Sequence, residues 1–322
     1  MISKRNLLIR LAAFGLAVAA GVAHAQAQYP DKPIRMIVPW AAGGSTDATS
    51  RALAKAAEAH LGQPIVVVNV PGASTTIGMS QLNRAAPDGY TIGTLSSTSY
   101  NFAVSGQKLP YDAIQGFSYI SYYGDNLIGI AVPASSPFKT LAELIEHGKK
   151  HRLTYGTAGA VSTQHLIGAG LQRATGAQLD HIPMNGSAGS INALLGKHVD
   201  FQVEVSVWMP HLESGAVRVL AVNTPNRSKH LPNLPTLREL GFPYLRSVQG
   251  VIAPPGLPEP IRAKLETAFR KALTDPAFIN TMDRMSMEVI DMSGADTKAL
   301  VEREFERAQQ LVREGALGEV QR

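Results

Sequence analysis

The fold is decided by the segment Ile34-Arg35-Met36-Ile37-Val38-Pro39-Trp40-Ala41-Ala42-Gly43-Gly44-Ser45-Thr46-Asp47. Its apolar first half predicts a buried strand that stops at Pro39, because proline lacks the N–H group that a sheet needs. The small residues that follow predict a loop. Apolar residues then recur with helical spacing as far as Leu61, which predicts a helix. The segment therefore predicts a strand–loop–helix unit, the building block of an α/β protein.

The same rhythm continues along the chain. Residues 65–70 are a β-branched run typical of a strand in a parallel sheet, residues 76–86 predict a helix, and residues 90–95 predict a third strand. This βαβαβ order predicts a doubly wound parallel sheet with helices on both faces. Residues 119–132 are extended and long, and we interpret them as one strand that crosses to a second lobe.

A second unit of similar size follows this long strand. Helices and strands alternate again between residues 140 and 222, a return strand is predicted at 248–253, and the rest of the chain is helical. The sequence therefore predicts an α/β protein of two lobes in which a hinge closes a ligand cleft. We place one lobe at residues 29–124 plus 250–322 and the other at residues 125–249.

The N-terminus predicts export. Three cations and no acid precede an apolar run from Leu11 to Ala20, and Ala23-His24-Ala25 supplies a small-x-small cleavage site. We therefore predict a signal peptide over residues 1–25 and a periplasmic location. Removing 25 of the 322 residues leaves 297, and removing three cations from a net charge of +5 leaves +2. So small a charge argues against nucleic-acid binding, which needs a concentrated basic face.

Missing motifs narrow the function further. The chain has no cysteine, which excludes a disulfide scaffold, thiol catalysis and cysteine-based metal sites. It also lacks the G-x-S-x-G, H-E-x-x-H and G-x-x-x-x-G-K-[ST] patterns. His147 and His151 are four residues apart on a predicted helix, but no third metal ligand accompanies them. We therefore expect a protein without catalytic residues, metal or cofactor.

Three loops between a strand and a helix share small, uncharged and hydroxyl-bearing residues. They lie at residues 43–46, 156–163 and 185–189, and Ser97 follows the third strand on the same surface. Glycine lets the backbone approach a ligand, and the first N–H groups of a helix lack partners within it. Such loops bind anions with main-chain donors. Because they contain no Lys or Arg, a carboxylate fits them better than a phosphate. For each loop alone, an ordinary strand-to-helix connection is the alternative.

Residues near strand ends are further candidates. Trp40 lies at the mouth of the first loop, where it would form an apolar wall for a ligand or pack between the lobes. Trp208 follows a predicted strand and has core packing as its alternative role. Glu204 interrupts an apolar strand, and a buried Glu needs a partner. Either it forms a salt bridge or lies on an exposed strand face, or it contacts a donor group of a ligand in the cleft.

Short motifs occur in a fixed order over the whole mature chain. They are VPWAAGGSTD at 38–47, PDGYT at 87–91, LPYD at 109–112, the loop and helix start at 156–166, GKHVD at 196–200, LPNLPT at 231–236 and APPG at 253–256. As an ordered set they resemble the extracytoplasmic binding receptors of the tripartite tricarboxylate transporter system, the Bug or TctC-like family.

The resemblance implies a periplasmic-binding-protein fold of the type II class, a small carboxylate ligand and a two-subunit membrane permease as partner. It implies that main-chain donors and bridging waters hold one carboxylate between residues 43–45 of one lobe and residues 157–162 of the other. It implies no cofactor, and we expect a monomer. With the loop chemistry, the candidate ligand-binding residues are Trp40, Ala41, Gly43, Gly44, Ser45, Ser97, Thr157, Ala158, Ser162, Asn185, Gly186, Ser187 and Glu204.

Two sites depart from the pattern of that family. Ser74 and Thr75 stand where the family usually has glycines, and they would contact the ligand or rigidify the loop. Glu204 stands where the family usually has Asp, which faces the far end of the ligand in some members. The longer acid would repel a second carboxylate, so we predict a ligand whose distal end carries a hydrogen-bond donor or an amine.

Two other functions stay open from the sequence. A periplasmic hydrolase would need a nucleophile and a base, and the nearest pair is Ser162 with His165, three residues apart on one helix face. No acid that would orient this histidine is evident. A receptor of the same fold would alternatively feed a sensor kinase, and the sequence does not separate this role from transport.

Overall fold

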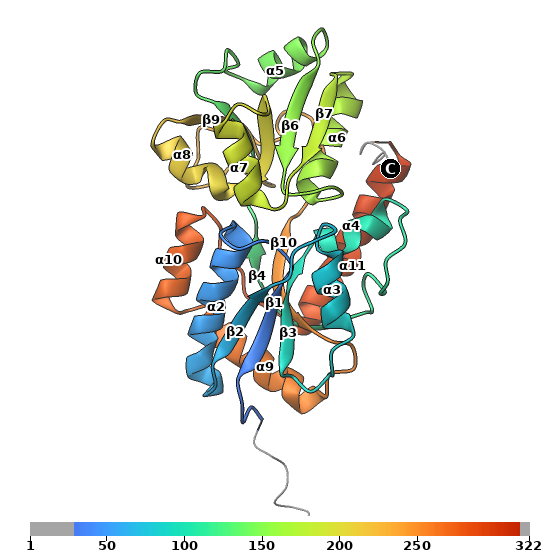
Figure 1. The fold of residues 1–322 in the computed structure, drawn as a ribbon, viewed down its shortest axis with the longest axis vertical. Helices are drawn as coiled ribbons and strands as arrows, with labels where there is room; N and C mark the ends of the chain where they lie inside the picture. Colours follow the sequence, from blue (N-terminus) through green and yellow to red (C-terminus); the bar gives the residue numbers. More distant parts are fainter. Residues whose placement is uncertain (1–28, 316–322) are drawn as a thin grey trace, which may run out of the picture.

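The computed structural model describes residues 29–315. The chain forms two mixed sheets flanked by helices, and the two halves are stacked along the long axis of the molecule (Figure 1). The predicted signal peptide, residues 1–25, lies outside the described residues. Within residues 29–315, no helix combines the length and apolar character needed to cross a bilayer.

The first sheet has the strand order β11-β4-β10-β3-β1-β2. Its strands are β1 (Ile34–Val38), β2 (Ile65–Asn69), β3 (Thr91–Ser96), β4 (Ser118–Asp125), β10 (Val248–Ala253) and β11 (Met292–Ser293). The predicted parallel arrangement holds for β1, β2 and β3. It does not extend to β10, which pairs antiparallel with both β3 and β4 because the chain re-enters this sheet from the other lobe.

Helices cover both faces of this sheet, as predicted. They are α2 (Ser45–Leu61), α3 (Thr76–Asn83), α4 (Thr98–Val104), α9 (Glu259–Ala272), α10 (Pro276–Arg284) and α11 (Gly294–Arg313). Leu53 of α2 and Phe269 of α9 are fully buried in one apolar cluster. Met79 of α3 and Leu300 of α11 belong to the cluster on the opposite face.

The second sheet has the strand order β7-β6-β8-β5-β9. Its strands are β5 (Ile128–Pro133), β6 (Leu153–Thr157), β7 (Leu179–Pro183), β8 (Phe201–Val205) and β9 (Val217–Asn223). Its helical segments are α5 (Leu141–Gly148), α6 (Thr163–Thr175), α7 (Ser187–Leu195), α8 (Met209–Glu213) and the short 3-10 turn η1 (Ser206–Trp208). The carboxyl end of β6 faces the first lobe (Figure 1), and β8 runs parallel to β6, so η1 follows β8 at the same edge of the sheet.

The prediction of one strand over residues 119–132 was wrong. The strand is interrupted at Asn126, where the chain passes from the first sheet to the second. The main-chain N–H of Asn126 donates to the Ser247 carbonyl at 2.8 Å, and its side-chain amide donates to the Ser247 hydroxyl at 3.1 Å. The outgoing and returning segments therefore bond to each other at this point, and Leu245 of the returning segment also bonds to Asn223 of β9. This pair of segments connects the two sheets.

A charged pair lies beside these crossings. Arg246 approaches Asp125 at 3.5 Å, and both side chains are about one-fifth exposed. Burial raises the pKa of Asp125 to about 6, although the charge of Arg246 and a hydrogen bond from Tyr122 oppose the rise. Near neutral pH the pair is therefore ionised and joins the ends of β4 and the returning segment.

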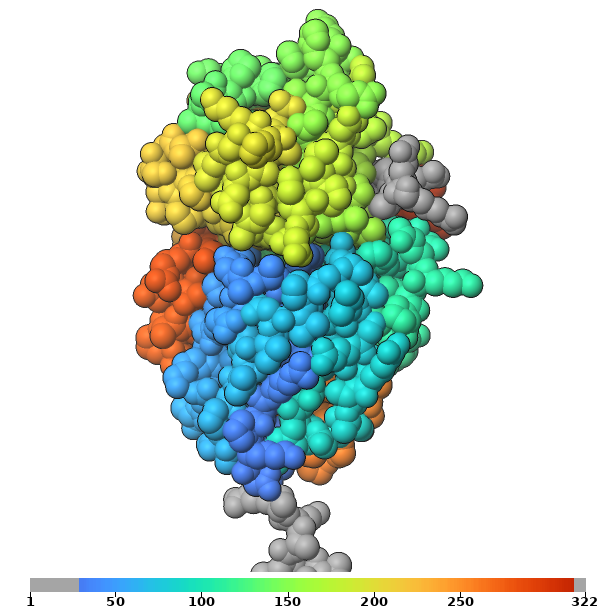
Figure 2. Space-filling model, in the orientation of Figure 1, coloured from blue at the N-terminus to red at the C-terminus, as the bar shows by residue number. Residues whose placement is uncertain are grey.

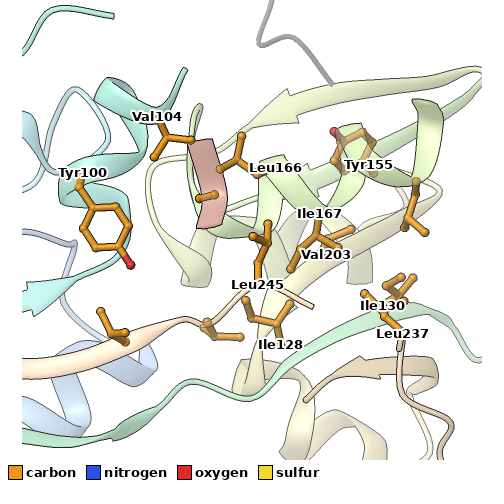
Figure 3. Packing of buried hydrophobic residues seen from close by; sticks show 14 of the residues in the cluster. Tyr100, Val104, Ile128, Ile130, Tyr155, Leu166, Ile167, Val203, Leu237 and Leu245 are labelled. Atoms are coloured by element: carbon orange, nitrogen blue, oxygen red, sulfur yellow. The ribbon is translucent and has the colours of Figure 1, made fainter. Parts of the chain in front are cut away.

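Apolar packing continues from one lobe into the other. Val104 of α4 lies beside Leu166 of α6 (Figure 3), and Tyr100 of α4 and Leu245 of the returning segment belong to the same apolar cluster. All four side chains are buried. The two halves thus share one apolar cluster. The boundaries given above for the lobes stay a prediction.

Candidate ligand-binding cleft

The two halves meet along a narrow seam in the surface (Figure 2), and two adjoining compartments lie between residues of the two lobes. The inner compartment is lined by Trp40, Ala41, Gly44, Ser45, Thr46, Ser96, Thr98, Asn126, Ala158, Gln164, Ser187, Val205 and Ser247. The outer compartment is lined by Trp40, Pro71, Gly72, Ala73, Ser74, Thr75, Ala158, Gly159, Ala160, Pro183, Met184 and Asn185. Trp40 and Ala158 border both.

The compartments differ in size. The inner one has a free volume of about 20 Å³, which is enough for little more than one water-sized group. The outer one has about 340 Å³, within the range of small-molecule sites. The inner compartment thus suits the terminal oxygens of a ligand, and the outer one suits its body.

In the first lobe, Asp47 fixes the loop that enters the inner compartment. Its carboxylate accepts hydrogen bonds from the main-chain N–H of Gly43 at 3.0 Å and from the Asn69 amide at 2.9 Å, and it pairs with Arg51. Burial opposes its ionisation, but these hydrogen bonds and the charge of Arg51 hold the pKa of Asp47 below its ordinary value. Gly43 itself has a φ of +87°, which glycine adopts without strain. Asp47 therefore shapes this loop.

In the second lobe, two stacked histidine rings support the loop after β6. The His165 and His181 ring centroids are 3.7 Å apart, and His181 is hydrogen bonded to the Thr157 hydroxyl at 2.7 Å. The main-chain N–H of Val161 donates to His165 Nδ1 at 3.1 Å. Burial lowers the pKa of His165 to about 4, and burial together with its neighbour lowers that of His181 to about 3. Both rings are therefore neutral near pH 7.

The N-terminal turns of several helices converge on the inner compartment. Ser45 begins α2, Thr98 begins α4, Gln164 lies in the first turn of α6 and Ser187 begins α7. The first N–H groups of a helix have no partner within it, and the helix dipole is positive at this end. The residues that line the inner compartment include no charged side chain. The site can thus hold a small anion with main-chain and hydroxyl donors alone.

Glu204 lies behind this compartment with no solvent exposure. Its Oε2 accepts hydrogen bonds from the Val205 N–H at 2.7 Å and the Gln164 amide at 3.4 Å. Its Oε1 has no partner among residues 29–315. Burial raises the pKa of Glu204 to about 7, while the hydrogen bonds from Val205 and Gln164 work against the rise. Glu204 thus lies directly behind the lining of the inner compartment, and its place at the far end of a ligand, which the resemblance implies, stays a prediction.

The structure gathers part of the predicted site. Of the candidates, those that line a compartment are Trp40, Ala41, Gly44, Ser45, Ala158, Asn185 and Ser187. Those that support the walls from behind or beside them are Gly43, Ser97, Thr157, Ser162, Gly186 and Glu204. Trp208 is fully buried against Gly129, and its indole N–H donates to the Glu204 carbonyl at 2.9 Å, so its role is core packing.

Sequence reasoning missed several lining residues. Asn126 and Ser247 border the inner compartment from the two crossings, and only a pair of folded sheets brings these distant segments together. Gln164 was detectable, because it lies in the first turn of a predicted helix that follows a candidate loop. Met184 and Pro183 of the outer compartment carry no chemical signal in the sequence.

The pair proposed for a hydrolase does not have catalytic geometry. The Ser162 hydroxyl caps α6 by accepting a hydrogen bond from the main-chain N–H of His165 at 3.1 Å. The imidazole of His165 meets the Val161 N–H and the His181 ring instead of the serine hydroxyl. Among residues 29–315, no three His, Cys, Asp or Glu side chains come together as metal ligands.

Two α/β lobes around an uncharged cleft lined by helix starts define a substrate-binding protein. Comparison with known proteins agrees: the family described as "Tripartite tricarboxylate transporter family receptor" matches residues 49–317. The chain belongs to this family. Its family and structural relatives are substrate-binding proteins rather than enzymes, and receptors of the family are periplasmic.

Individual relatives match nearly the whole chain. A UPF0065 protein from the gbd 5' region of Cupriavidus necator is 36% identical over 89% of this chain and 88% of its own length. Protein BugT of Bordetella pertussis is 32% identical over 96% of this chain and 98% of its own length. The solved structure of the periplasmic binding protein BugD has a TM-score of 0.85 and 32% identity, covering 90% of this chain and 99% of that chain.

Two further solved structures contain ligands. MatC from Rhodopseudomonas palustris, with bound malate, has a TM-score of 0.83 and 27% identity over 88% of this chain and 100% of that chain. An R. palustris protein with adipate has a TM-score of 0.82 and 26% identity, covering 90% of this chain and 99% of that chain. Both ligands are carboxylates.

Proposed function

We propose that this protein captures a small carboxylate in the cleft and delivers it to a two-subunit membrane permease of the tripartite tricarboxylate type. The observation that carries the proposal is the inner compartment, in which the starts of four helices meet without a charged side chain on the lining. Malate and adipate in two structural relatives support a carboxylate as the ligand.

Capture has two steps in this proposal. One carboxylate group first binds the loop at residues 43–45 of the first lobe, and the loops at 157–162 and 185–187 of the second lobe then close over it. Closure excludes bulk water and strengthens the hydrogen bonds to the main chain. The ligand drives closure only through its higher affinity for the closed form. The permease would then recognise the closed form.

The predicted signal peptide at residues 1–25 supports a periplasmic location, where a receptor of this kind meets both its ligand and the permease. Binding is tested by calorimetry with malate, adipate and hexanoate. Absence of binding for these and for a wider panel of carboxylates would overturn carboxylate capture.

Delivery is tested by uptake of a radiolabelled carboxylate that binds. Cells lacking this protein should lose uptake and recover it with the wild-type gene. Uptake that persists without the protein, while a transcriptional response to the ligand is lost, would favour a receptor that feeds a sensor kinase.

A further inference from the structure

The outer compartment differs in chemistry from the inner one. Trp40, Pro71, Pro183 and Met184 give it apolar faces, and Ser74, Thr75 and Asn185 give it neutral hydrogen-bonding groups. None of the described residues that line it carries an ionisable side chain. A carboxylate placed there would lose its hydration without gaining a cation.

Helix α3 begins at this compartment, and its first turn leaves fewer main-chain N–H groups free for an anion. The N–H groups of Thr76 and Ile77 donate to the carbonyls of Ala73 and Gly72, at 3.1 and 3.5 Å. The loop before α3 thus occupies donors that a helix start usually leaves free. The outer compartment therefore offers a second carboxylate neither a cationic side chain nor a free N–H group from Thr76 or Ile77.

The loop that forms the first-lobe wall of this compartment has an unusual backbone. Ala73, Ser74 and Thr75 have φ values of +43°, +45° and +82°, a left-handed conformation that a β-branched residue such as Thr75 rarely adopts. Strain of this kind persists where surrounding structure enforces it, and it clusters at ligand-binding sites. The sequence thus keeps hydroxyl residues in positions that suit glycine.

Ser74 and Thr75 both line the outer compartment, and the Thr75 hydroxyl lacks a hydrogen-bond partner. Thr75 has no solvent exposure, and its Oγ1 has no hydrogen-bond partner among residues 29–315. Ser74 lies opposite Gly159 of the second lobe, where a β-carbon added to Gly159 would lie 2.8 Å from the Ser74 Oγ. A buried hydroxyl without a partner is unfavourable, and a polar group on a ligand would supply one.

We propose that the outer compartment is the specificity subsite of the cleft: it takes the uncharged distal end of a monocarboxylate, with Ser74 and Thr75 as its hydrogen-bonding residues. The inference rests on the proposed function, because the inner compartment must hold the carboxylate. Among ligands of equal length, the favoured one carries a neutral donor or acceptor, such as a hydroxyl, where a dicarboxylate carries its second charge.

Three acids of equal chain length test the subsite. Hexanoate, 6-hydroxyhexanoate and adipate differ only at the distal end, and calorimetry with the full-length mature protein gives their dissociation constants. We expect 6-hydroxyhexanoate to bind at least about 10-fold more tightly than adipate. If adipate binds as tightly or more tightly, the subsite assignment is overturned while carboxylate capture stands. If neither these acids nor malate nor the wider panel of carboxylates binds, the proposed function fails and the inference fails with it.

Two variants test the residues themselves. Thr75→Val keeps the shape of the side chain and removes the hydroxyl, and Ser74→Ala does the same for its neighbour. A lost hydrogen bond should weaken 6-hydroxyhexanoate binding roughly 3- to 10-fold in at least one variant and leave hexanoate within about 2-fold. An unchanged ratio between the two ligands in both variants would overturn the roles of Ser74 and Thr75, whatever the effect on stability.

Discussion

Glu204 places an ionisable group directly behind the inner compartment, and this residue should make carboxylate binding depend on pH. Burial raises its pKa to about 7, so it is neutral below that pH and negative above it. A buried negative charge repels a ligand carboxylate, so affinity should be constant below about pH 6 and fall as the pH rises through 7, by at most about 10-fold per pH unit. Glu204→Gln should remove this fall.

The measurement is a series of calorimetric titrations between pH 5.5 and 8.5 with whichever carboxylate binds. Asp125, whose pKa burial raises to about 6, does not line the inner compartment, and Asp125→Asn serves as the control. Parallel pH profiles for wild type and Glu204→Gln would contradict the placement of Glu204 beside the bound carboxylate.

Gly186 tests how closely the lobes approach each other. It has a φ of +88°, and an added β-carbon would lie 3.3 Å from that of Ala41 in the other lobe. Because its ψ of 168° places it in a region essentially limited to glycine, Gly186→Ala should cost about 1–3 kcal/mol of stability from strain. It should also lower ligand affinity, by roughly 10-fold, by obstructing closure. Gly215→Ala is the matched control, because Gly215 has a φ of +73° with nothing within 4 Å of the added carbon. Equal affinities for the two variants would show that closure does not bring these loops together.

At the scale of elements, the returning segment depends on Ser97. Its hydroxyl accepts a hydrogen bond from the Val248 N–H at 2.8 Å and donates to the Arg246 carbonyl at 3.1 Å. Ser97→Ala leaves a buried N–H unpaired and should cost about 1–3 kcal/mol in the free energy of unfolding, with ligand affinity within about 2-fold. Chemical denaturation and calorimetry give both quantities. A large loss of affinity at unchanged stability would instead make Ser97 a ligand contact, as its sequence position suggests.

The sequence predicts regular elements well where the hydrophobic pattern is strong. The run from Ile34 to Val38 and the spacing of Leu53 within α2 leave little choice of structure. Helix α4 escaped prediction because its start at Thr98 is rich in hydroxyl residues and has no apolar stripe. The break at Asn126 escaped as well, since apolar residues on both sides make the segment look like one strand.

The candidate site is predictable only in part, because the sequence reveals its loops but not which of their residues face the cleft. Loops that follow a strand and start a helix are visible in the sequence, which is why Gly44, Ser45 and Ser187 were found. Which of their residues face the cleft depends on both sheets at once. Thr157 and Ser162 have the expected chemistry, yet their hydroxyls bond within the second lobe.

At the scale of the whole molecule, the arrangement of the lobes in this structure can be trapped covalently. A β-carbon added to Gly159 would lie 3.6 Å from that of Ser74, within the range of a disulfide. Because the chain has no cysteine, Ser74→Cys combined with Gly159→Cys introduces one pair without competing thiols. We expect the disulfide to form under mild oxidation, and to form faster when a bound carboxylate favours closure. A rate that does not respond to the ligand would contradict closure driven by binding.

The central claim is that an uncharged cleft recognises a carboxylate group. Thermal unfolding with paired acids and amides tests it most directly: malate, adipate, hexanoate and 6-hydroxyhexanoate, each beside the amide of the same skeleton. A ligand at 100 times its Kd stabilises the folded state by about 2.7 kcal/mol, which is readily seen as a rise in Tm. The account predicts that at least one acid raises the Tm and that its amide does not. A set of acids that leave the Tm unchanged, or amides that raise it equally, would contradict the account.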